Sequence, residues 1–358
     1  SAAKQFYNEV CEGVATVNHL IQKGIDCDAQ SKGYLRVAHK PSMIKPLQEQ
    51  TKFLESLFDY QTTFLDSKTI RQQYFDSSHA YGAIKFNDGY GINPLKLAWG
   101  YARLAAEAGV KIYTASPVEQ IVALNSPSAA LSSDTDKHNY QLVTPSGLVK
   151  ANKVIIATNG YTPFELHSSL NKRMLPVLSQ IIVTRPLTKD ELTQCNFLTD
   201  NVVMDTRALK YYFRKLPDNR ILFGGRGAIN GKDAEDPYYA NRLLGILKNS
   251  FPGLNQSGSN SINIEYAWSG WISMALDDIP HIVKGDEQGN LFYSAGYCGN
   301  GVSFSVQAGK RLAEMVAGIA VPKIPIYTQR LPKFPFSPLR RVGQWGYFQY
   351  GKVKDRWL

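Results

Sequence analysis

The sequence predicts a mixed α/β fold in which a parallel sheet covered by helices accompanies an antiparallel sheet. Residues 154–157 are four consecutive apolar residues, which is typical of a parallel strand buried on both faces. Residues 291–295 form a predicted strand that runs through a glycine-rich turn into a helix ending near Gly318. Short strand-like segments prevail between 176 and 283, and they favour an antiparallel layer.

Helices are predicted mainly in the first third of the chain. Apolar residues recur at helical spacing over 3–23, and Gly24 then provides a usual helix end. A second helix is expected from Pro41 to Phe58. Asn93 followed by proline is typical of a helix start, because asparagine accepts hydrogen bonds from free N–H groups and proline tolerates the first helical position. Further helices are expected at 68–74, 95–108 and 237–250.

Strands are predicted where apolar residues alternate with polar ones or follow one another. Pro217, Asp218 and Asn219 have the turn chemistry of a hairpin between two of these strands. A segment rich in Ser, Asp and Pro over 126–139 is expected to be a solvent loop. The predicted strands are 34–38, 111–114, 118–124, 140–144, 148–151, 153–158, 177–184, 202–205, 211–216, 221–224 and 262–271.

Composition narrows the class of protein. With 44% hydrophobic residues the chain can bury a globular core. The longest nearly unbroken apolar stretch, 315–322, is far shorter than the roughly 20 residues of a membrane span, so we expect no transmembrane segment and a cytoplasmic location. The four cysteines and six histidines are scattered without ligand spacing, which argues against a disulfide framework and against a metal site.

The net charge of +10 is concentrated at the end of the chain. Residues 323–358 carry eight Lys or Arg against one acid, Asp355, and eight aromatic residues. One interpretation is that the aromatic residues dock this tail on the body while the cations stay in water. The alternative is a contact with a membrane surface or nucleic acid. Docking is favoured, and we expect no nucleic-acid partner.

The glycine-rich turn at 296–301 carries the strongest functional signal. Gly296, Gly299 and Gly301 lie where a strand passes into a helix, so the backbone can approach a ligand closely and aim free N–H groups at it. The alternative is a tight connection without a ligand.

Three segments together, 118–121, 154–160 and 296–301, resemble the later flavin-contacting segments of the D-amino-acid-oxidase superfamily of FAD-dependent oxidoreductases. Within it, residues 211–214, 218–220 and 339–357 are most similar to the γ-glutamylputrescine oxidase-like proteins. The resemblance covers essentially the whole chain. It implies FAD as cofactor, held by Val118, Ala157, Thr158, Asn159, Gly160, Gly296, Tyr297, Cys298, Gly299, Asn300, Gly301 and Val302.

The resemblance also implies the domain organisation. The FAD-binding domain is expected at 1–24, 80–165 and 275–320, the substrate domain at 25–79 and 166–274, and a basic aromatic tail at 321–358. The fold class is thus α/β (α+β mixed), with an incomplete FAD-binding parallel sheet, helices, and an antiparallel substrate-domain sheet.

One departure from the superfamily is large. Its members begin with a strand, G-x-G-x-x-G, a helix and an acidic residue that bind the ADP half of FAD, and this sequence has no such segment. We therefore expect a fragment that binds FAD poorly, or not at all, unless the segment is supplied. The missing strand is expected between the strands at 154–158 and 291–295, which leaves a vacancy beside Ile155 and Phe292.

In this superfamily the flavin takes a hydride from the carbon that bears a neutral amine, the imine is hydrolysed, and dioxygen reoxidises the flavin to give hydrogen peroxide. The N–H groups around Gly299, Asn300 and Gly301 are implied to stabilise the negative charge on the reduced flavin. Most close relatives have histidine in place of Asn300, and the alternative is a left-handed turn residue. Cys298 could form a flavin thioether, but packing alone is the favoured interpretation.

For the substrate, an amine, we expect contacts from Tyr212, Arg214, Trp268, Trp271 and Ile272. Strand alternation places Tyr211 on the face opposite Tyr212 and Arg214, as a core aromatic. Trp268 has packing as its alternative role. No catalytic residue is assigned, because hydride transfer needs no protein nucleophile. His281 is expected to be structural.

Position 272 informs the substrate class. Amino-acid oxidising members have an arginine there that grips the substrate α-carboxylate, and an apolar isoleucine cannot do so. We expect an amine that lacks an α-carboxylate, of the γ-glutamylputrescine type. The alternatives are a truncated noncatalytic binding or assembly module, and an amino-acid oxidase or dehydrogenase of the same superfamily.

Overall fold

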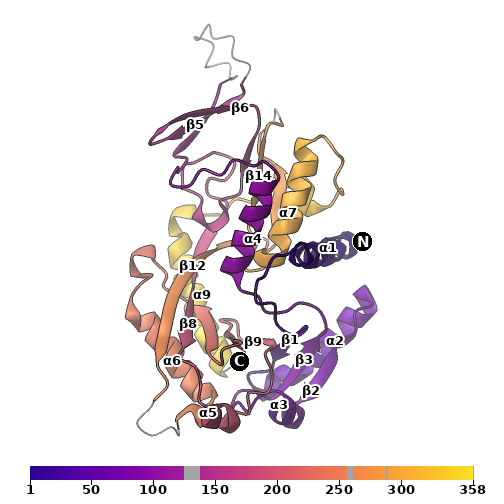
Figure 1. Ribbon diagram of the computed structural model, residues 1–358, viewed down its shortest axis with the longest axis vertical. Helices are drawn as coiled ribbons and strands as arrows, with labels where there is room; N and C mark the ends of the chain where they lie inside the picture. Colours follow the sequence, from indigo (N-terminus) through magenta and orange to yellow (C-terminus); the bar gives the residue numbers. More distant parts are fainter. Residues whose placement is uncertain (125–137, 256–260, 287–288, 358) are drawn as a thin grey trace. The chain divides into compact units, whose positions relative to one another are not determined.

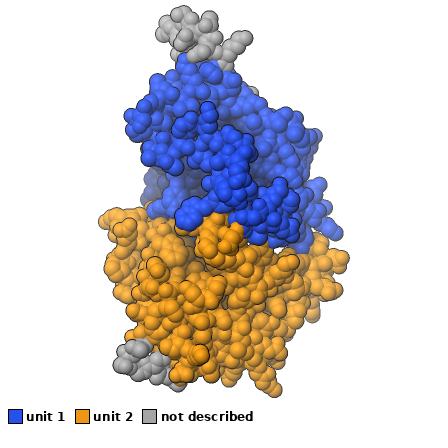
Figure 2. Space-filling view, viewed as in Figure 1, with its two compact units in different colours: residues 1–25, 98–177, 271–340 blue, residues 26–97, 178–270, 341–358 orange. Residues whose placement is uncertain are grey.

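The structure, a computed structural model, describes residues 1–124, 138–255, 261–286 and 289–357. The chain forms two compact units, each built from three segments (Figure 2). Unit 1 contains residues 1–25, 98–177 and 271–340, and unit 2 contains residues 26–97, 178–270 and 341–358. The unit boundaries differ from the expected domains in three ways: residues 80–97 lie in unit 2, residues 166–177 and 271–274 lie in unit 1, and the tail is divided after residue 340 instead of forming a separate part.

Helices α1 and α7 lie side by side in unit 1 (Figure 1). Their close approach depends on Gly13, where an added Cβ would lie only 3.0 Å from the carbonyl oxygen of Ser303. Phe6 and Val10 of α1 pack against the buried Phe304 and Leu312 of α7. The helices with residues in unit 1 are α1 (Ala2–Gln22), α4 (Pro94–Glu107), α7 (Gly301–Val316) and α8 (Pro325–Thr328).

Unit 1 contains two small sheets. The first has the order β13 (His281–Lys284), β14 (Leu291–Ala295) and β7 (Val154–Ile156), with β14 parallel to β7 and antiparallel to β13. The second is an antiparallel meander of β4 (Gln120–Ala123), β5 (Tyr140–Thr144) and β6 (Gly147–Ala151).

The expected vacancy between the strands at 154–158 and 291–295 is wrong. Phe292 stands opposite Ile155 in a direct parallel pair, so no strand fits between them. The other edge of β14 is occupied by β13, a strand that the sequence analysis did not predict. Within the described part of the chain, β7 is an edge strand, and Ile155 on it is 45% exposed.

The larger sheet has eight strands in the order β12-β8-β11-β10-β9-β1-β3-β2. Neighbouring strands from β8 to β2 pair antiparallel, except that β9 pairs parallel with β1. The bounds are β12 (Ile264–Met274), β8 (Leu175–Thr184), β11 (Ile221–Arg226), β10 (Tyr212–Lys215), β9 (Val202–Asp205), β1 (Tyr34–Val37), β3 (Gly82–Phe86) and β2 (Thr63–Asp66). The predicted mixed α/β fold is confirmed.

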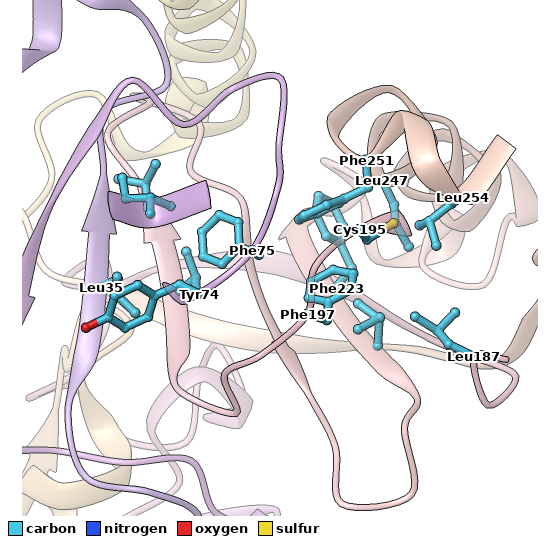
Figure 3. Close-up of a cluster of buried hydrophobic side chains, with 14 of the residues drawn as sticks. Leu35, Tyr74, Phe75, Leu187, Cys195, Phe197, Phe223, Leu247, Phe251 and Leu254 are labelled. Carbon is cyan, nitrogen blue, oxygen red and sulfur yellow. The ribbon is translucent and has the colours of Figure 1, made fainter. Parts of the chain in front are cut away.

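Aromatic side chains form the centre of unit 2 (Figure 3). Phe251 packs against Phe75, Phe197 and Phe213 with ring centroids 6.0, 4.7 and 5.2 Å away. Helix α6, which ends just before Phe251, contributes Leu243 and Leu247. The helices with residues in unit 2, besides the first turn of α4, are α2 (Ile44–Phe58), α3 (Ser67–Gln73), α5 (Lys189–Gln194), α6 (Pro237–Ser250) and α9 (Arg340–Trp357).

Several local predictions differ from the structure. The strand expected at 111–114 is absent from these described residues, and β2, β3, β13 and α9 were not predicted. Most of the loop expected at 126–139 lies outside the described residues. Among the helices that the structure describes, none combines the length and apolar character required to cross a bilayer.

Candidate functional site

A cavity of about 470 Å³ in unit 1 gathers many of the residues expected at the site. It lies at the junction of β14 and α7, beside the end of β7. A neighbouring hollow of about 350 Å³ shares three of its residues and adds Asn300. The expected residues that line the cavity are Ala157, Asn159, Trp271, Ile272, Tyr297, Gly299, Gly301 and Val302.

Three residues of the glycine-rich turn have left-handed backbone, but Asn300, the candidate from the sequence, is not one of them. Gly296, Cys298 and Gly299 have φ of 82°, 51° and 91°, whereas Asn300 has φ −99°. The left-handed alternative for Asn300 is therefore wrong: its φ is negative, and the left-handed residues of the turn are the two before it, Cys298 and Gly299. The turn is anchored on β12 by a hydrogen bond of 2.9 Å from the Cys298 N–H to the Ser273 carbonyl.

The amino-terminal end of α7 offers unpaired donors to the cavity. Asn300 occupies the N-cap position, but its side chain makes no capping hydrogen bond. The N–H groups of a first helical turn have no partner within the helix, and the helix dipole adds partial positive charge there. No acidic residue occupies this turn. The arrangement suits an electron-rich ligand edge.

Asn159 ties the end of β7 to the glycine turn. Its Oδ1 accepts a hydrogen bond of 3.1 Å from the Gly296 N–H. Next to it, an added Cβ on Gly160 would lie 2.8 Å from the Trp271 carbonyl oxygen, so only glycine allows this approach. Thr158 is exposed, and its hydroxyl lies 2.7 Å from that of Thr162.

Cys298 is held by hydrogen bonds that suit a packing role. Its thiol donates to the Gly296 carbonyl at 3.1 Å, and its sulfur accepts from the Ala275 N–H at 3.3 Å. Burial raises the pKa of this thiol to about 12. A thiol that stays protonated near neutral pH is a poor nucleophile, which weighs against a thioether.

Ser273 is a site candidate that the sequence analysis missed. It is fully buried and lines the cavity, and its hydroxyl has no hydrogen-bond partner among the described residues. A buried hydroxyl without a partner is destabilising, so it fits a position where a ligand completes the hydrogen bonding. A lone serine beyond the end of a predicted strand gave no signal.

Trp271 and Ile272 lie in the same cavity, whereas Val118 does not line it. The Trp271 N–H donates to the hydroxyl of Tyr161 at 3.3 Å, which fixes this part of β12 within unit 1. Val118 is half-buried and packs against the cluster that contains Tyr140.

The other expected substrate residues belong to unit 2. Tyr212 is largely buried, and its hydroxyl lies 2.8 Å from that of Ser179. Arg214 donates to Gln30 Oε1 at 2.8 Å and to the Ile92 carbonyl at 2.6 Å. Burial lowers the pKa of Arg214 from its usual value.

Tyr211 and Trp268, also in unit 2, lie apart from the contacts of Tyr212 and Arg214. Tyr211 lines a separate cavity, in agreement with strand alternation between it and Tyr212. The side chain of Trp268 is 45% exposed on β12, and its carbonyl accepts a hydrogen bond from Gln180.

His281 has the contacts of a structural residue. It is fully buried, its Nδ1 lies 2.7 Å from the Gln329 carbonyl oxygen, and its Nε2 lies 3.0 Å from Asp277 Oδ2. Across the residues that the structure describes, no group of three or more His, Cys, Asp or Glu side chains could hold a metal ion.

Comparisons with known proteins agree with this geometry. A family described as FAD dependent oxidoreductase matches residues 2–315. Gamma-glutamylputrescine oxidoreductase of Escherichia coli is 31% identical over 350 residues, which cover 94% of this chain and 75% of that protein. A probable oxidoreductase, OrdL, of Haemophilus influenzae is 29% identical over 88% of this chain and 68% of its own.

Solved structures show the same fold. Glycine oxidase from Geobacillus kaustophilus matches with a TM-score of 0.73 and 19% identity over 91% of this chain and 82% of that one. L-proline dehydrogenase from P. horikoshii matches with a TM-score of 0.69 and 17% identity over 89% of this chain and 80% of its own.

Proposed function

Because this chain belongs to the FAD-dependent oxidoreductase family, we propose that it oxidises an amine with no α-carboxylate on its reacting carbon and passes the two electrons to dioxygen, which is reduced to hydrogen peroxide. The substrate would be of the γ-glutamylputrescine type. The enzyme class and the FAD cofactor follow from the family itself.

The observation that carries the substrate class is the lining of the unit 1 cavity. Trp271 and Ile272 border it, and none of the described residues that line it is Lys or Arg. A substrate carboxylate in an apolar setting needs a cationic partner, since an unpaired buried charge is strongly unfavourable. An amine that enters the cavity in its neutral form, with no carboxylate on the reacting carbon, needs no cationic partner there.

The residues of this cavity fit FAD. Gly160, Gly299 and Gly301 keep the backbone open, the first turn of α7 offers N–H donors, and the Ser273 hydroxyl lacks a partner among the described residues. When bound, FAD supplies a two-electron acceptor for the hydride of the amine carbon. The chain itself would orient the ligand, exclude water with Trp271 and Tyr297, and stabilise negative charge at the turn.

The substrate proposal is tested by anaerobic mixing of flavin-loaded protein with amines. We expect γ-glutamylputrescine to bleach the flavin absorbance, and readmitted air to restore it with release of one hydrogen peroxide per turnover. Glycine, sarcosine and D-alanine serve as comparison substrates. Faster bleaching by any of these amino acids would contradict the proposal.

We also propose that a strand–glycine–helix segment for the ADP half of FAD pairs with the outer edge of β7. The support is that β7 is the edge strand of its sheet among the described residues and that its Ile155 is exposed, whereas parallel strands are usually covered. These 358 residues by themselves would then retain little FAD after gel filtration. Retention of one FAD per chain would contradict this proposal. We further propose a cytoplasmic location, which agrees with four unpaired cysteines.

A further inference from the structure

Unit 2 contains a cavity of about 410 Å³ that the proposed amine oxidation does not use. It lies beside the carboxyl-terminal end of α9, on the Tyr211 side of β10, whereas Tyr212 points to the opposite face of the same strand. Its size is within the range of small-molecule sites.

The charge of this cavity is strongly positive. Five cationic side chains line it, and the lining contains one carboxylate, that of Asp355. Both oxygens of Asp355 are already engaged, because they accept hydrogen bonds from the backbone N–H groups of Ala208 and Leu209 at 2.7 and 3.1 Å. The cationic residues are Lys40, Arg207, Arg226, Lys352 and Arg356.

Three of these cations, Arg207, Lys40 and Arg356, already have interaction partners. Arg207 forms an ion pair with Asp205. Lys40 donates to the carbonyl oxygen of Lys354 at 2.9 Å, in the last turn of α9, where the helix dipole favours a cation. These residues would be expected here without any ligand.

In the part of the chain that the structure describes, Arg226 and Lys352 have no partner that neutralises their charge, although Lys352 Nζ donates a hydrogen bond of 3.2 Å to the amide oxygen of Gln349. Among the described residues, neither they nor the adjacent Arg242 form an ion pair with a carboxylate, and the buried Nε atoms of Arg226 and Arg242 have no hydrogen-bond partner. Arg242 donates to the carbonyl of Arg226, and the Arg226 guanidinium stacks 5.4 Å above the Phe348 ring. Burial, together with the charges of Arg226 and Arg242, lowers the pKa of Lys352.

The two histidines of the cavity do not add charge at neutral pH. Burial and the nearby Arg207 lower the pKa of His39 to about 4, and the same two causes lower the pKa of His79. Both imidazoles are therefore neutral, and the His39 ring is already engaged, because its Nδ1 lies 2.8 Å from the Thr206 hydroxyl and its Nε2 lies 3.3 Å from the Asp355 carbonyl oxygen. Leu209 and Tyr211 provide an apolar wall.

We propose that this cavity binds a phosphoryl group, either as free phosphate or on a small organic phosphate. A multivalent oxyanion would neutralise Arg226 and Lys352, which no carboxylate of the described chain neutralises. Guanidinium groups bind phosphate oxygens through paired N–H donors, and a lysine ammonium adds a compact charge. The apolar wall leaves room for an organic body.

Titration calorimetry of the whole chain with inorganic phosphate and with ribose 5-phosphate tests this inference, with chloride at matched ionic strength as reference. We expect saturable binding of one phosphoryl compound per chain. Tenfold tighter binding of the sugar phosphate would identify an organic phosphate as the occupant, and equal or weaker binding would identify free phosphate. No saturable binding of either compound would overturn the proposal.

Two variants test the location. Lys352→Gln should weaken binding at least tenfold, because one charge-assisted hydrogen bond is removed. Lys354→Gln is the matched control, since it removes the same charge two residues away, where Lys354 lies over the Tyr350 ring. Arg226→Gln provides a second variant inside the cavity. An equal effect of Lys352→Gln and Lys354→Gln would indicate general attraction and overturn the site. The measurement needs neither FAD nor turnover, so it is independent of the proposed amine oxidation.

Discussion

The two units contain arginine clusters that differ in how their charge is balanced. In unit 1, Arg311 on α7 is 11% exposed and forms ion pairs with Glu9, Glu12 and Glu314. In unit 2, Arg226 approaches Arg242 and Lys352 with no carboxylate paired to them among the described residues. The charge of the first cluster, which joins α1 and α7, is neutralised by carboxylates of the chain itself. The charge of the second cluster would be neutralised by a bound anion.

The largest expected effect is on the unfolding free energy when the Glu9–Arg311 ion pair of unit 1 is removed. Glu9→Gln leaves the buried Arg311 without its main partner, and we expect the unfolding free energy to fall by about 3–5 kcal/mol. Glu12 is the matched control, because its side chain is 47% exposed and Glu12→Gln should cost less than about 1 kcal/mol. Urea denaturation followed by circular dichroism measures both. Equal small losses would show that the Glu9 pair is not structural.

The same cluster predicts an acid dependence. Burial by itself would raise the pKa of Glu9, but hydrogen bonds from Arg311, Tyr327 and Gln307 outweigh it, and the net pKa lies below its ordinary 4.5. A lowered folded-state pKa contributes stability that is present above pH 4.5 and is lost as the pH falls through the folded value. The unfolding free energy should therefore decrease more steeply below pH 4.5 in the wild type than in Glu9→Gln. Parallel curves would contradict the assignment.

The glycine turn of unit 1 should be the next most sensitive position. Gly299 has φ of 91°, so Gly299→Val should destabilise the chain by about 1–3 kcal/mol and also obstruct the unit 1 cavity that we propose for the flavin. Gly318 is a matched control, since its φ is 77° and it lies after α7, away from the cavity lining. Flavin absorbance per protein after loading with FAD should fall for Gly299→Val alone. A similar fall for Gly318→Val would assign the effect to stability.

The smallest expected effect compares glycines within α6 of unit 2 and α7 of unit 1. An added Cβ at Gly245 or Gly309 meets no atom within 4 Å, so replacement by alanine should stabilise each helix by about 0.5–1 kcal/mol. Gly309 also lines the unit 1 cavity, and only Gly309→Ala should reduce flavin loading. Thermal melting and flavin absorbance give the two readouts. Unchanged loading in both variants would exclude Gly309 from the flavin contact.

Local sequence patterns predicted many elements well. The helical spacing over 3–23 corresponds to α1, and Asn93 with Pro94 marks the start of α4. The short strands β2, β3 and β13 were missed because their formation depends on pairing with distant strands more than on their own composition. Helix α9 was missed because Gly343, Gly346 and Gly351 lower its helix propensity.

A tertiary contact explains the glycine at position 351. An added Cβ at Gly351 would lie 2.7 Å from Leu209 Cγ, so glycine lets α9 pack closely against Leu209 within unit 2. Phe348 of the same helix is buried, in agreement with the favoured docking of the tail. This packing places Lys352 beside Arg226, a neighbourhood that no spacing in the sequence indicated.

By itself the sequence determined the helical and strand segments with strong periodicity and the glycine turn, because these are set by residues close together along the chain. It also indicated the enzyme family, because motifs in several separate segments match that family together. Only the tertiary structure decided that β7 pairs directly with β14, that Ser273 lines the unit 1 cavity, and that cations from distant segments meet beside α9. The physical reason is that strand pairing, burial and convergence of charge depend on which distant segments the fold brings together.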